Sequence, residues 1–220
     1  MNNINPLENY QTNGYFVWRN LVSSELIDVL LGNYHSEVLP SKRFFVRQDS
    51  GKWQTNQINE FGHLKNPLGD PHDVLSEFKF GQCLRNLLCG QEIHLALSAV
   101  AGYKEFRFIQ SMFYDCNGNS PAHTDNLYLD TVPNGHLVGI WIALEDIHVD
   151  AGRFYVMPGS NRFEFEIQKV NPTSLYVSEI EDYALKNADK IEAPALRKGD
   201  VVFWNSNCSW FLANQECTVF

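Results

Sequence analysis

The sequence has little of what membrane proteins, nucleic-acid-binding proteins and disulfide-rich secreted proteins require. Basic residues number 17 against 26 acidic ones, and the formal charge is -9, whereas a nucleic-acid surface needs a basic stripe that neutralises phosphates. The longest clean apolar run, Val138 to Leu144, is too short to span a bilayer. The opening stretch MNNINPLENYQTNG has no basic segment of a signal peptide. We therefore expect a soluble, cytoplasmic protein that binds neither membranes nor nucleic acids.

Closely spaced cysteine pairs are also missing. The five cysteines show no CxxC spacing, and their number is odd; they are Cys83, Cys89, Cys116, Cys208 and Cys217. Without a secretion signal, this pattern predicts reduced thiols and argues against a zinc site.

What the sequence does contain is typical of one globular domain. A chain of 220 residues suffices for one sizeable core, and the hydrophobic and charged fractions, 44% and 20%, are ordinary. The 15 Phe, nine Tyr and five Trp favour aromatic-rich strands. We expect a single domain over residues 1–220, with a helical part over about 1–90 and a β-barrel part over about 91–220.

The first part of the chain predicts helices around a long excursion. Residues 14–18 predict a strand, and a helix follows from about Ser23, with Ser23 or Ser24 as its N-cap. The polar stretch 40–70 predicts a long excursion around the core, and the segment from about Ser41 to His72 is expected to cover the mouth of a pocket. A second helix is expected over about 70–90, with Asp70 as its cap and a proline in its first turn.

Beyond residue 92 the pattern changes to short aromatic and β-branched segments separated by turn residues. These are EIHLALSAV, EFRFIQSMFYD, HLVGIWIALEDI, RFYVMPG and DVVFWNS. One helical interruption is expected around 174–187. The order predicts a mainly β fold with flanking helices, an antiparallel barrel or jelly roll.

Two His-x-Asp pairs are candidate metal sites. Residues i and i+2 of a strand project from one face, so His123 and Asp125 can bring an imidazole and a carboxylate to one ion. With a distant histidine, such a pair forms the facial triad of non-haem Fe(II) oxygenases. The alternative for His123 is a histidine at the barrel mouth that is hydrogen-bonded to a carboxylate. The second pair, His148 and Asp150, follows an acidic strand end and predicts a solvated turn instead.

Several motifs occur together in an order that resembles the phytanoyl-CoA dioxygenase family of Fe(II)/2-oxoglutarate-dependent oxygenases. They are NGYFVWRNLVSSELIDVL, QSMFYD, SPAHTD, HLVGIWIALEDI, DAGRFYVMPGSNR and KGDVVFWNS. The resemblance implies a double-stranded β-helix, that is, a jelly-roll, cupin-like core, with the cofactors Fe(II), 2-oxoglutarate and O2. It also implies hydroxylation of a small organic substrate while 2-oxoglutarate is converted to succinate and CO2. The sequence indicates neither the substrate nor the oligomeric state.

The resemblance assigns a role to five residues. It implies that His123 and Asp125 are iron ligands, that Met112 and Trp141 line the 2-oxoglutarate pocket, and that Gln110 is their neighbour. The strand pattern agrees for Trp141, because small residues at 139 and 143 share its face and leave a hollow beside it. Without the resemblance, core packing would explain both Trp141 and Met112.

The pattern breaks near the end of the chain. Trp210 stands where the family has its third ligand, a histidine, and an indole cannot ligate iron. The family's 2-oxoglutarate-binding arginine is also absent, since no Arg or Lys follows Lys198. We therefore expect the last barrel strand to be missing and turnover to be impaired. Either the chain is a pseudoenzyme, or another histidine substitutes (His94 or His136), or the reading frame has shifted.

A frameshift is testable at Trp210-Phe211. Their codons, TGG-TTY, give glycine when read one nucleotide later, and the adjacent frame permits the missing His-Gly-Ser from about Asn207 onward. Two other functions stay open: a catalytically inactive jelly-roll binding module, and another cupin-like metalloenzyme such as an epimerase.

Overall fold

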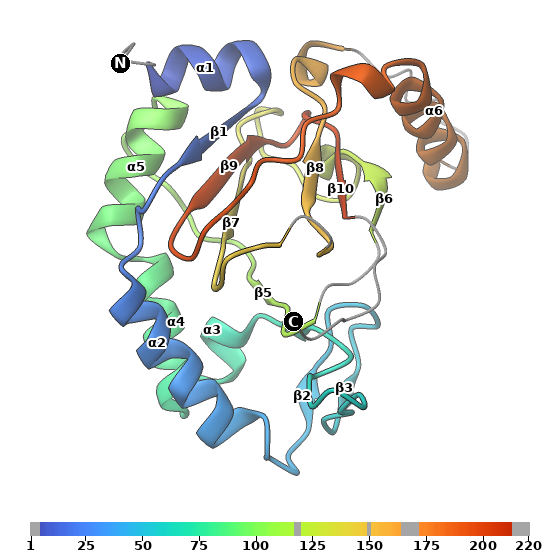
Figure 1. The fold of residues 1–220 in the computed structure, drawn as a ribbon. Helices are drawn as coiled ribbons and strands as arrows, with labels where there is room; N and C mark the ends of the chain where they lie inside the picture. The colour runs from blue at the N-terminus through green and yellow to red at the C-terminus, as the bar shows by residue number, and fades with distance from the viewer. Residues whose placement is uncertain (1–4, 117–119, 149–150, 164–171, 213–220) are drawn as a thin grey trace.

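Helices and strands form layers in the computed structural model, which describes residues 5–116, 120–148, 151–163 and 172–212 (Figure 1). The α-helices are α1 (Pro6–Asn13), α2 (Ser24–Asn33), α3 (Pro71–Val74), α4 (Lys79–Leu88), α5 (Gln91–Ala101) and α6 (Pro172–Lys186). Short helical turns are η1 (Tyr34–Val38), η2 (Asp125–Leu127), η3 (Ser160–Arg162) and η4 (Ala188–Lys190). The strands are β1 (Tyr15–Trp18), β2 (Phe45–Val46), β3 (Trp53–Gln54), β4 (Leu68–Gly69), β5 (Met112–Phe113), β6 (Ser120–His123), β7 (Val138–Ile142), β8 (Phe154–Val156), β9 (Val201–Asn205) and β10 (Trp210–Leu212).

Two three-stranded antiparallel sheets carry the candidate site. The first has the order β1-β9-β7, and the second has the order β6-β10-β8. Each combines strands that are distant in sequence, so the site can form only after the chain has folded back on itself. Two further pairs are β2-β3 and β4-β5. Strands β2, β3 and β4 lie within the excursion over residues 40–70, and β5 pairs with its end.

The alternation of side chains along β9 explains how the layers pack. Val201 and Phe203 belong to the core between the first sheet and the helices, whereas Val202 and Trp204 belong to the core between the two sheets. Consecutive residues of a strand point to opposite faces, so both faces of this sheet are covered. Val201, Val202 and Phe203 are fully buried, and Trp204 is 8% exposed.

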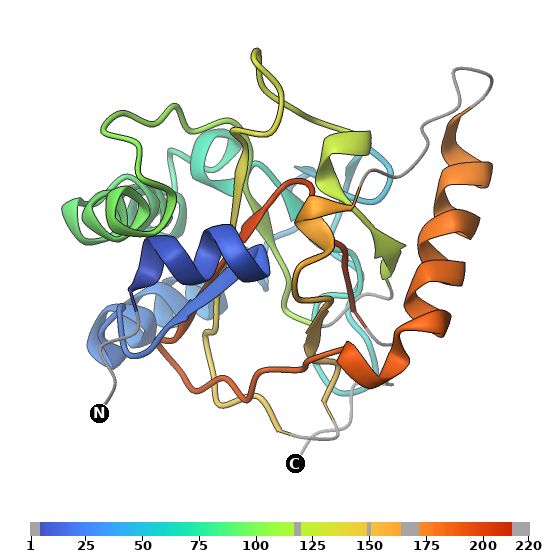
Figure 2. The same ribbon diagram turned by 90° about the horizontal axis from the view of Figure 1, so that it is seen from above.

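The second sheet is covered on its outer side by α6, which lies away from the cluster of α1, α2, α4 and α5 (Figure 2). A small cluster joins them: Ala122 of β6, Met157 after β8 and Ile180 of α6 are all buried. The order is therefore helices, sheet, sheet and helix, a mixed arrangement of helices and several sheets.

Most of the predicted elements are confirmed. The strand at 14–18 is β1, and the helix from Ser23 is α2, whose first turn is capped by the Ser23 hydroxyl accepting from the Leu26 N–H at 3.2 Å. The second helix is divided into α3 and α4. Asp70 does not cap it with its side chain, because its carboxylate accepts from the Ser111 N–H instead. The interruption at 174–187 is α6.

The prediction of a strand over EIHLALSAV was wrong, because these residues form α5. The buried positions are Ile93, Ala96, Leu97 and Val100, a spacing of three and four residues that places them on one face of a helix. Gly90 precedes the helix and Gly102 ends it in the left-handed conformation. The helical part therefore extends to residue 101 rather than to about 90, and the next strand along the chain is β5.

Two other predictions need adjustment. Within EFRFIQSMFYD only Met112–Phe113 is a strand, and Cys116 is disulfide-bonded rather than reduced. Spacing in the sequence cannot reveal which cysteines meet in space.

None of the helices that the structure describes is long and apolar enough to cross a membrane.

Candidate functional site

His123 and Asp125 lie together at the end of β6. Thr124 between them is extended, with φ -119° and ψ 142°, so the two side chains project to the same side although η2 begins at Asp125. Nε2 of His123 is 3.6 Å from Oδ1 of Asp125, and the two side chains are 11% and 21% exposed. The predicted pairing of these residues is therefore present in the fold.

The hydrogen bond on the other ring nitrogen fixes how His123 faces its partner. Nδ1 lies 2.8 Å from the carbonyl oxygen of Pro121, so this nitrogen is the donor and Nε2 faces the carboxylate. An imidazole oriented by a backbone carbonyl is typical of metal-binding histidines. With Nδ1 as the donor, Nε2 of a neutral ring is an acceptor that faces Oδ1 of the carboxylate.

Both oxygens of Asp125, however, accept hydrogen bonds from tryptophan side chains. The indole N–H of Trp204 donates to Oδ2 at 2.8 Å, and that of Trp210 donates to Oδ1 at 2.9 Å. Trp204 extends from β9 of the first sheet and Trp210 from β10 of the second. The carboxylate is thus held from two sides.

Trp210 also packs directly against His123. The two residues are paired in the β10–β6 register, and their ring centroids are 4.4 Å apart. An indole has one donor and no acceptor, so it cannot serve as a ligand. Trp210, which the resemblance places at the position of the third ligand, therefore lies beside His123 and Asp125.

A third protein ligand is not found in the described part of the chain. Among residues 5–116, 120–148, 151–163 and 172–212, no group of three His, Cys, Asp or Glu side chains is placed to hold a metal ion. His94 packs edge-on to Phe106, and His136 stacks on Tyr103 at 5.1 Å between centroids. Two donors do not complete the facial triad of an iron site, so these residues do not fit a fully coordinated iron.

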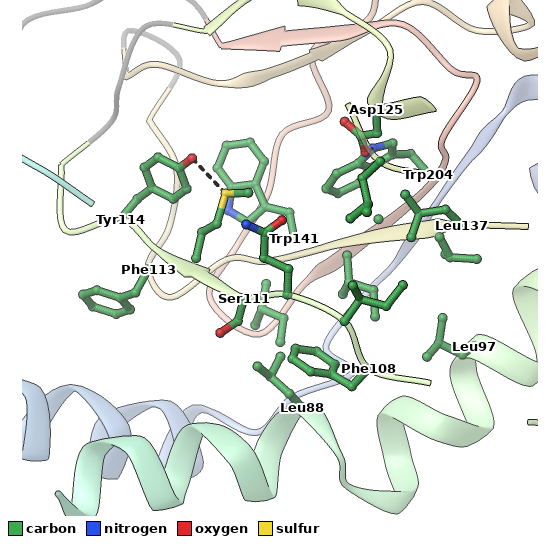
Figure 3. Close-up of a pocket in the computed structure, with 18 of the residues that line it drawn as sticks. Leu88, Leu97, Phe108, Ser111, Phe113, Tyr114, Asp125, Leu137, Trp141 and Trp204 are labelled. Atoms are coloured by element: carbon green, nitrogen blue, oxygen red, sulfur yellow. Dashed lines mark hydrogen bonds between the residues drawn. The ribbon is translucent and has the colours of Figure 1, made fainter. Parts of the chain in front are cut away.

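The pair borders a cavity of about 1840 Å³. Gln110, Met112 and Trp141, the other three predicted site residues, line the same cavity. In Figure 3, Trp141 and Trp204 lie above it and Leu88 and Leu97 below it, with Asp125 beside Trp204. Ligand pockets usually measure roughly 300–1,000 Å³, so this one has room for more than one small molecule.

Side-chain contacts hold the wall that carries Gln110 and Met112. The Gln110 amide donates to Oε1 of Gln48 at 3.3 Å, and the Tyr114 hydroxyl donates to the Met112 sulfur at 3.3 Å (Figure 3). Burial raises the pKa of Tyr114, and the negative charge of Asp125 adds to the rise. The phenol therefore keeps its proton and remains a donor in the cavity wall.

Sequence reasoning missed Trp204, although the strand pattern contained a signal. Gly139 of β7 pairs with Trp204, and a Cβ at Gly139 would lie 2.1 Å from the indole. The hollow predicted beside Trp141 is therefore filled at this point by the Trp204 ring. Only the register between β7 and β9 brings the two residues together.

Asp115 is a second centre that sequence reasoning missed. Its carboxylate accepts from the Tyr34 hydroxyl at 2.9 Å and from the Leu64 N–H at 2.6 Å, and it lies 3.5 Å from Nδ1 of His63. Burial, followed by the charge of Asp115, raises the pKa of Tyr34. This carboxylate ties η1 to the excursion, from which His63 and Gln48 reach the cavity. That contact agrees with the prediction that the excursion covers the mouth of the pocket.

The second His-x-Asp pair is only partly described. His148 is exposed and its carbonyl accepts from the Ala151 N–H at 3.1 Å, but Asp150 lies outside the described residues. His148 does not line the cavity that His123 and Asp125 border.

Comparisons with known proteins show which family the chain resembles. In the curated collection the chain is 34% identical over 109 residues to a phytanoyl-CoA dioxygenase domain-containing protein 1 homolog of Caenorhabditis elegans, covering 48% of this chain and 33% of that protein. It is 32% identical over 109 residues to phytanoyl-CoA dioxygenase 1 of Oryza sativa subsp. japonica, covering 48% of this chain and 34% of that protein. The matches thus span about a third of those relatives.

Solved structures share the fold. The non-heme alpha-ketoglutarate-dependent carbocyclase SnoK from nogalamycin biosynthesis matches with a TM-score of 0.69 at 19% identity, over 94% of this chain and 76% of that chain. EctD from S. alaskensis with bound Fe matches with a TM-score of 0.65 at 16% identity, over 96% and 73%. The model of one family, phytanoyl-CoA dioxygenase (PhyH), matches residues 10–210. The chain therefore belongs to the phytanoyl-CoA dioxygenase (PhyH) family.

Proposed function

We propose that the protein is a dioxygenase-type oxidoreductase that acts on a small organic substrate, and that its turnover is impaired in this polypeptide. The observation that carries the proposal is the pairing of His123 and Asp125, 3.6 Å apart, at the wall of a large cavity. Family membership makes the chain an enzyme by descent, in a family of Fe(II)/2-oxoglutarate-dependent oxygenases.

The cofactors of such an enzyme are Fe(II), 2-oxoglutarate and O2. His123 and Asp125 would hold the metal, and Gln110, Met112 and Trp141 would border the 2-oxoglutarate. The similarity to SnoK, an alpha-ketoglutarate-dependent carbocyclase, and to EctD, solved with bound Fe and with 2-oxoglutarate and 5-hydroxyectoine, supports this assignment. We also propose that the two sheets make up the double-stranded β-helix of one domain over residues 1–220.

The impairment follows from the ligand set. Loss even of a group that only orients a ligand typically lowers metal affinity or activity by about 10–100-fold, and here a direct ligand is replaced by Trp210. The side chain that packs against His123 is Trp210, whose indole offers no acceptor to a metal ion. We expect little or no succinate formation from 2-oxoglutarate.

Succinate formation in the presence of Fe(II), ascorbate and 2-oxoglutarate tests the proposal. We expect at least about 10-fold more succinate from Trp210→His than from the unmodified chain, and none from Trp210→His combined with His123→Ala. High turnover by the unmodified chain would contradict the impairment. No succinate from either protein, although both are folded and bind 2-oxoglutarate, would contradict the dioxygenase-type function.

The second candidate is a catalytically inactive jelly-roll module that binds a small molecule. The two indoles that hold Asp125 favour it, because they leave the cavity intact while occupying the carboxylate. Binding of 2-oxoglutarate analogues without any metal requirement would support it. The frameshift remains a prediction: sequencing the DNA across codons 200–225 decides whether the adjacent frame encodes His-Gly-Ser.

A further inference from the structure

Asp125 differs from an open metal ligand because both of its oxygens have fixed donors. The two N–H···O distances, 2.8 Å from Trp204 and 2.9 Å from Trp210, are those of well-formed hydrogen bonds to a charged acceptor. The side chain is only 21% exposed, so little water competes for these oxygens.

The two donors come from different sheets. Trp204 belongs to the sheet β1-β9-β7 and Trp210 to the sheet β6-β10-β8, while Asp125 follows β6 after one intervening residue, Thr124. The carboxylate therefore links the two sheets at the cavity, in addition to the apolar core between them.

Neighbouring residues hold both indoles in place. Phe154 stacks on Trp210, with centroids 5.3 Å apart and an interplanar angle of 19°, and it contacts Trp204 at 5.0 Å. The indole of Trp204 lies in the space left by Gly139. Because these rings are packed, the donors cannot turn away from Asp125 without disturbing the core between the sheets.

Trp210 also contacts both members of the pair. Its N–H donates to Oδ1, the same oxygen that lies 3.6 Å from Nε2 of His123, and its ring contacts the imidazole. A cation that bridged Nε2 and Oδ1 would meet the positive end of the N–H bond. The indole therefore excludes the ion, in addition to failing to ligate it.

We propose that Trp204 and Trp210 form a clamp that makes Asp125 a structural carboxylate joining the two sheets and closes the His123–Asp125 pair to metal ions. The inference rests on the proposed function only in that both concern the same pair of residues. The clamp distinguishes two explanations for weak metal binding: either the site only lacks a third ligand, or Trp210 also obstructs the His123–Asp125 pair.

Binding of Co²⁺, followed by calorimetry and visible absorption under anaerobic conditions, distinguishes them. Trp210→Phe removes the N–H donor but adds no ligand, so a merely missing ligand predicts no change. The clamp predicts several-fold tighter Co²⁺ binding by Trp210→Phe than by the unmodified chain, and this gain should vanish when His123→Ala is added. Trp210→His should bind more tightly still, by about 10-fold or more. Trp53→Phe, at a tryptophan that is 59% exposed, is the matched control and should change nothing.

Thermal unfolding gives a second measurement that does not depend on metal. Without metal, Trp210→Phe and Asp125→Ala should each lower the melting temperature by a few degrees, since a loss of 1 kcal/mol corresponds to about 2–4 °C for a chain of this size. The double variant should lose clearly less than the sum of the single losses, because both remove the same hydrogen bond. Additive losses would overturn the clamp.

The outcomes for the clamp and for the proposed function differ. Tight Co²⁺ binding by the unmodified chain that depends on His123 and Asp125 would overturn the clamp and leave the proposed function standing. If Trp210→His binds both Co²⁺ and 2-oxoglutarate but forms no succinate with Fe(II), the proposed function is overturned and the clamp is left standing.

Discussion

At the scale of single residues, Gly139 decides where the Trp204 indole lies. A Cβ at this position would be 2.1 Å from the indole Cε2 and 2.3 Å from Cζ2, far inside van der Waals contact. We expect Gly139→Ala to displace the ring and to destabilise the protein by about 1–3 kcal/mol, as overpacking does. Near-UV circular dichroism and thermal unfolding measure the two effects.

Gly32 offers the matched control for that substitution. It lies in α2, and nothing is within 4 Å of a Cβ built there. Gly32→Ala should leave the near-UV spectrum unchanged and should stabilise the helix by up to about 1 kcal/mol. An equal loss of stability in both variants would mean that the contact with Trp204 is not the cause.

Asp200 makes the stability dependent on pH. Burial alone would raise the pKa of its carboxyl, but N–H donors from Arg197 and Asn20 and the guanidinium of Arg19 lower it below its usual value. The lowered pKa contributes stability above the unfolded-state pKa, about 3.9, and this is lost as the pH falls through the folded-state value. Asp200→Asn should therefore destabilise the protein by about 1–3 kcal/mol at pH 7, with a smaller difference below about pH 4.

Urea unfolding of both proteins between pH 3 and 7 measures this difference. Glu77→Gln is the control, since Glu77 pairs with Arg43 at the surface with side chains that are 58% and 59% exposed. Such pairs contribute about 0–1 kcal/mol. A constant difference between the unmodified chain and Asp200→Asn over the whole pH range would exclude the proposed linkage.

At the scale of elements, the cap of α2 distinguishes two adjacent serines. The sequence allows Ser23 or Ser24, and the structure selects Ser23, which is extended and accepts from the Leu26 N–H at 3.2 Å. Ser23→Ala should cost about 1 kcal/mol, whereas Ser24→Ala, inside the first turn, should be nearly neutral or slightly stabilising. Urea unfolding compares the two, and equal losses would contradict the assigned cap.

Elements with a local signal could be predicted from the sequence, and those without one could not. The capped start of α2 and the aromatic alternation in β7 and β9 are local, and these elements were predicted. The apolar composition of α5 is compatible with a buried strand as well as with a helix, and only the helical spacing of its buried residues distinguishes the two. The segment before Met112 lacks ladder partners in the described residues, so its β-rich composition does not make it a strand.

At the scale of the whole molecule, the site could be predicted only where it is local. His123 and Asp125 are two residues apart, and the extended Thr124 between them is enough to bring them together. The indoles of Trp204 and Trp210 reach Asp125 from 79 and 85 residues away, through the registers of two different sheets. No local pattern encodes such a meeting, and it is this meeting that decides how available the carboxylate is.

The packing of the whole fold predicts how its melting temperature responds to metal ions. Its cores consist of packed apolar side chains on both faces of the first sheet, so the folded state of the described residues does not depend on an ion at His123. A chelator should therefore leave the melting temperature of the unmodified chain unchanged, and added Mn²⁺ should not raise it.

For Trp210→His, Mn²⁺ at 100 times its Kd should stabilise the fold by about 2.7 kcal/mol, which raises the melting temperature by several degrees. Differential scanning calorimetry with and without His123→Ala measures both responses. A chelator that lowers the melting temperature of the unmodified chain would show that the two-donor site already binds an ion.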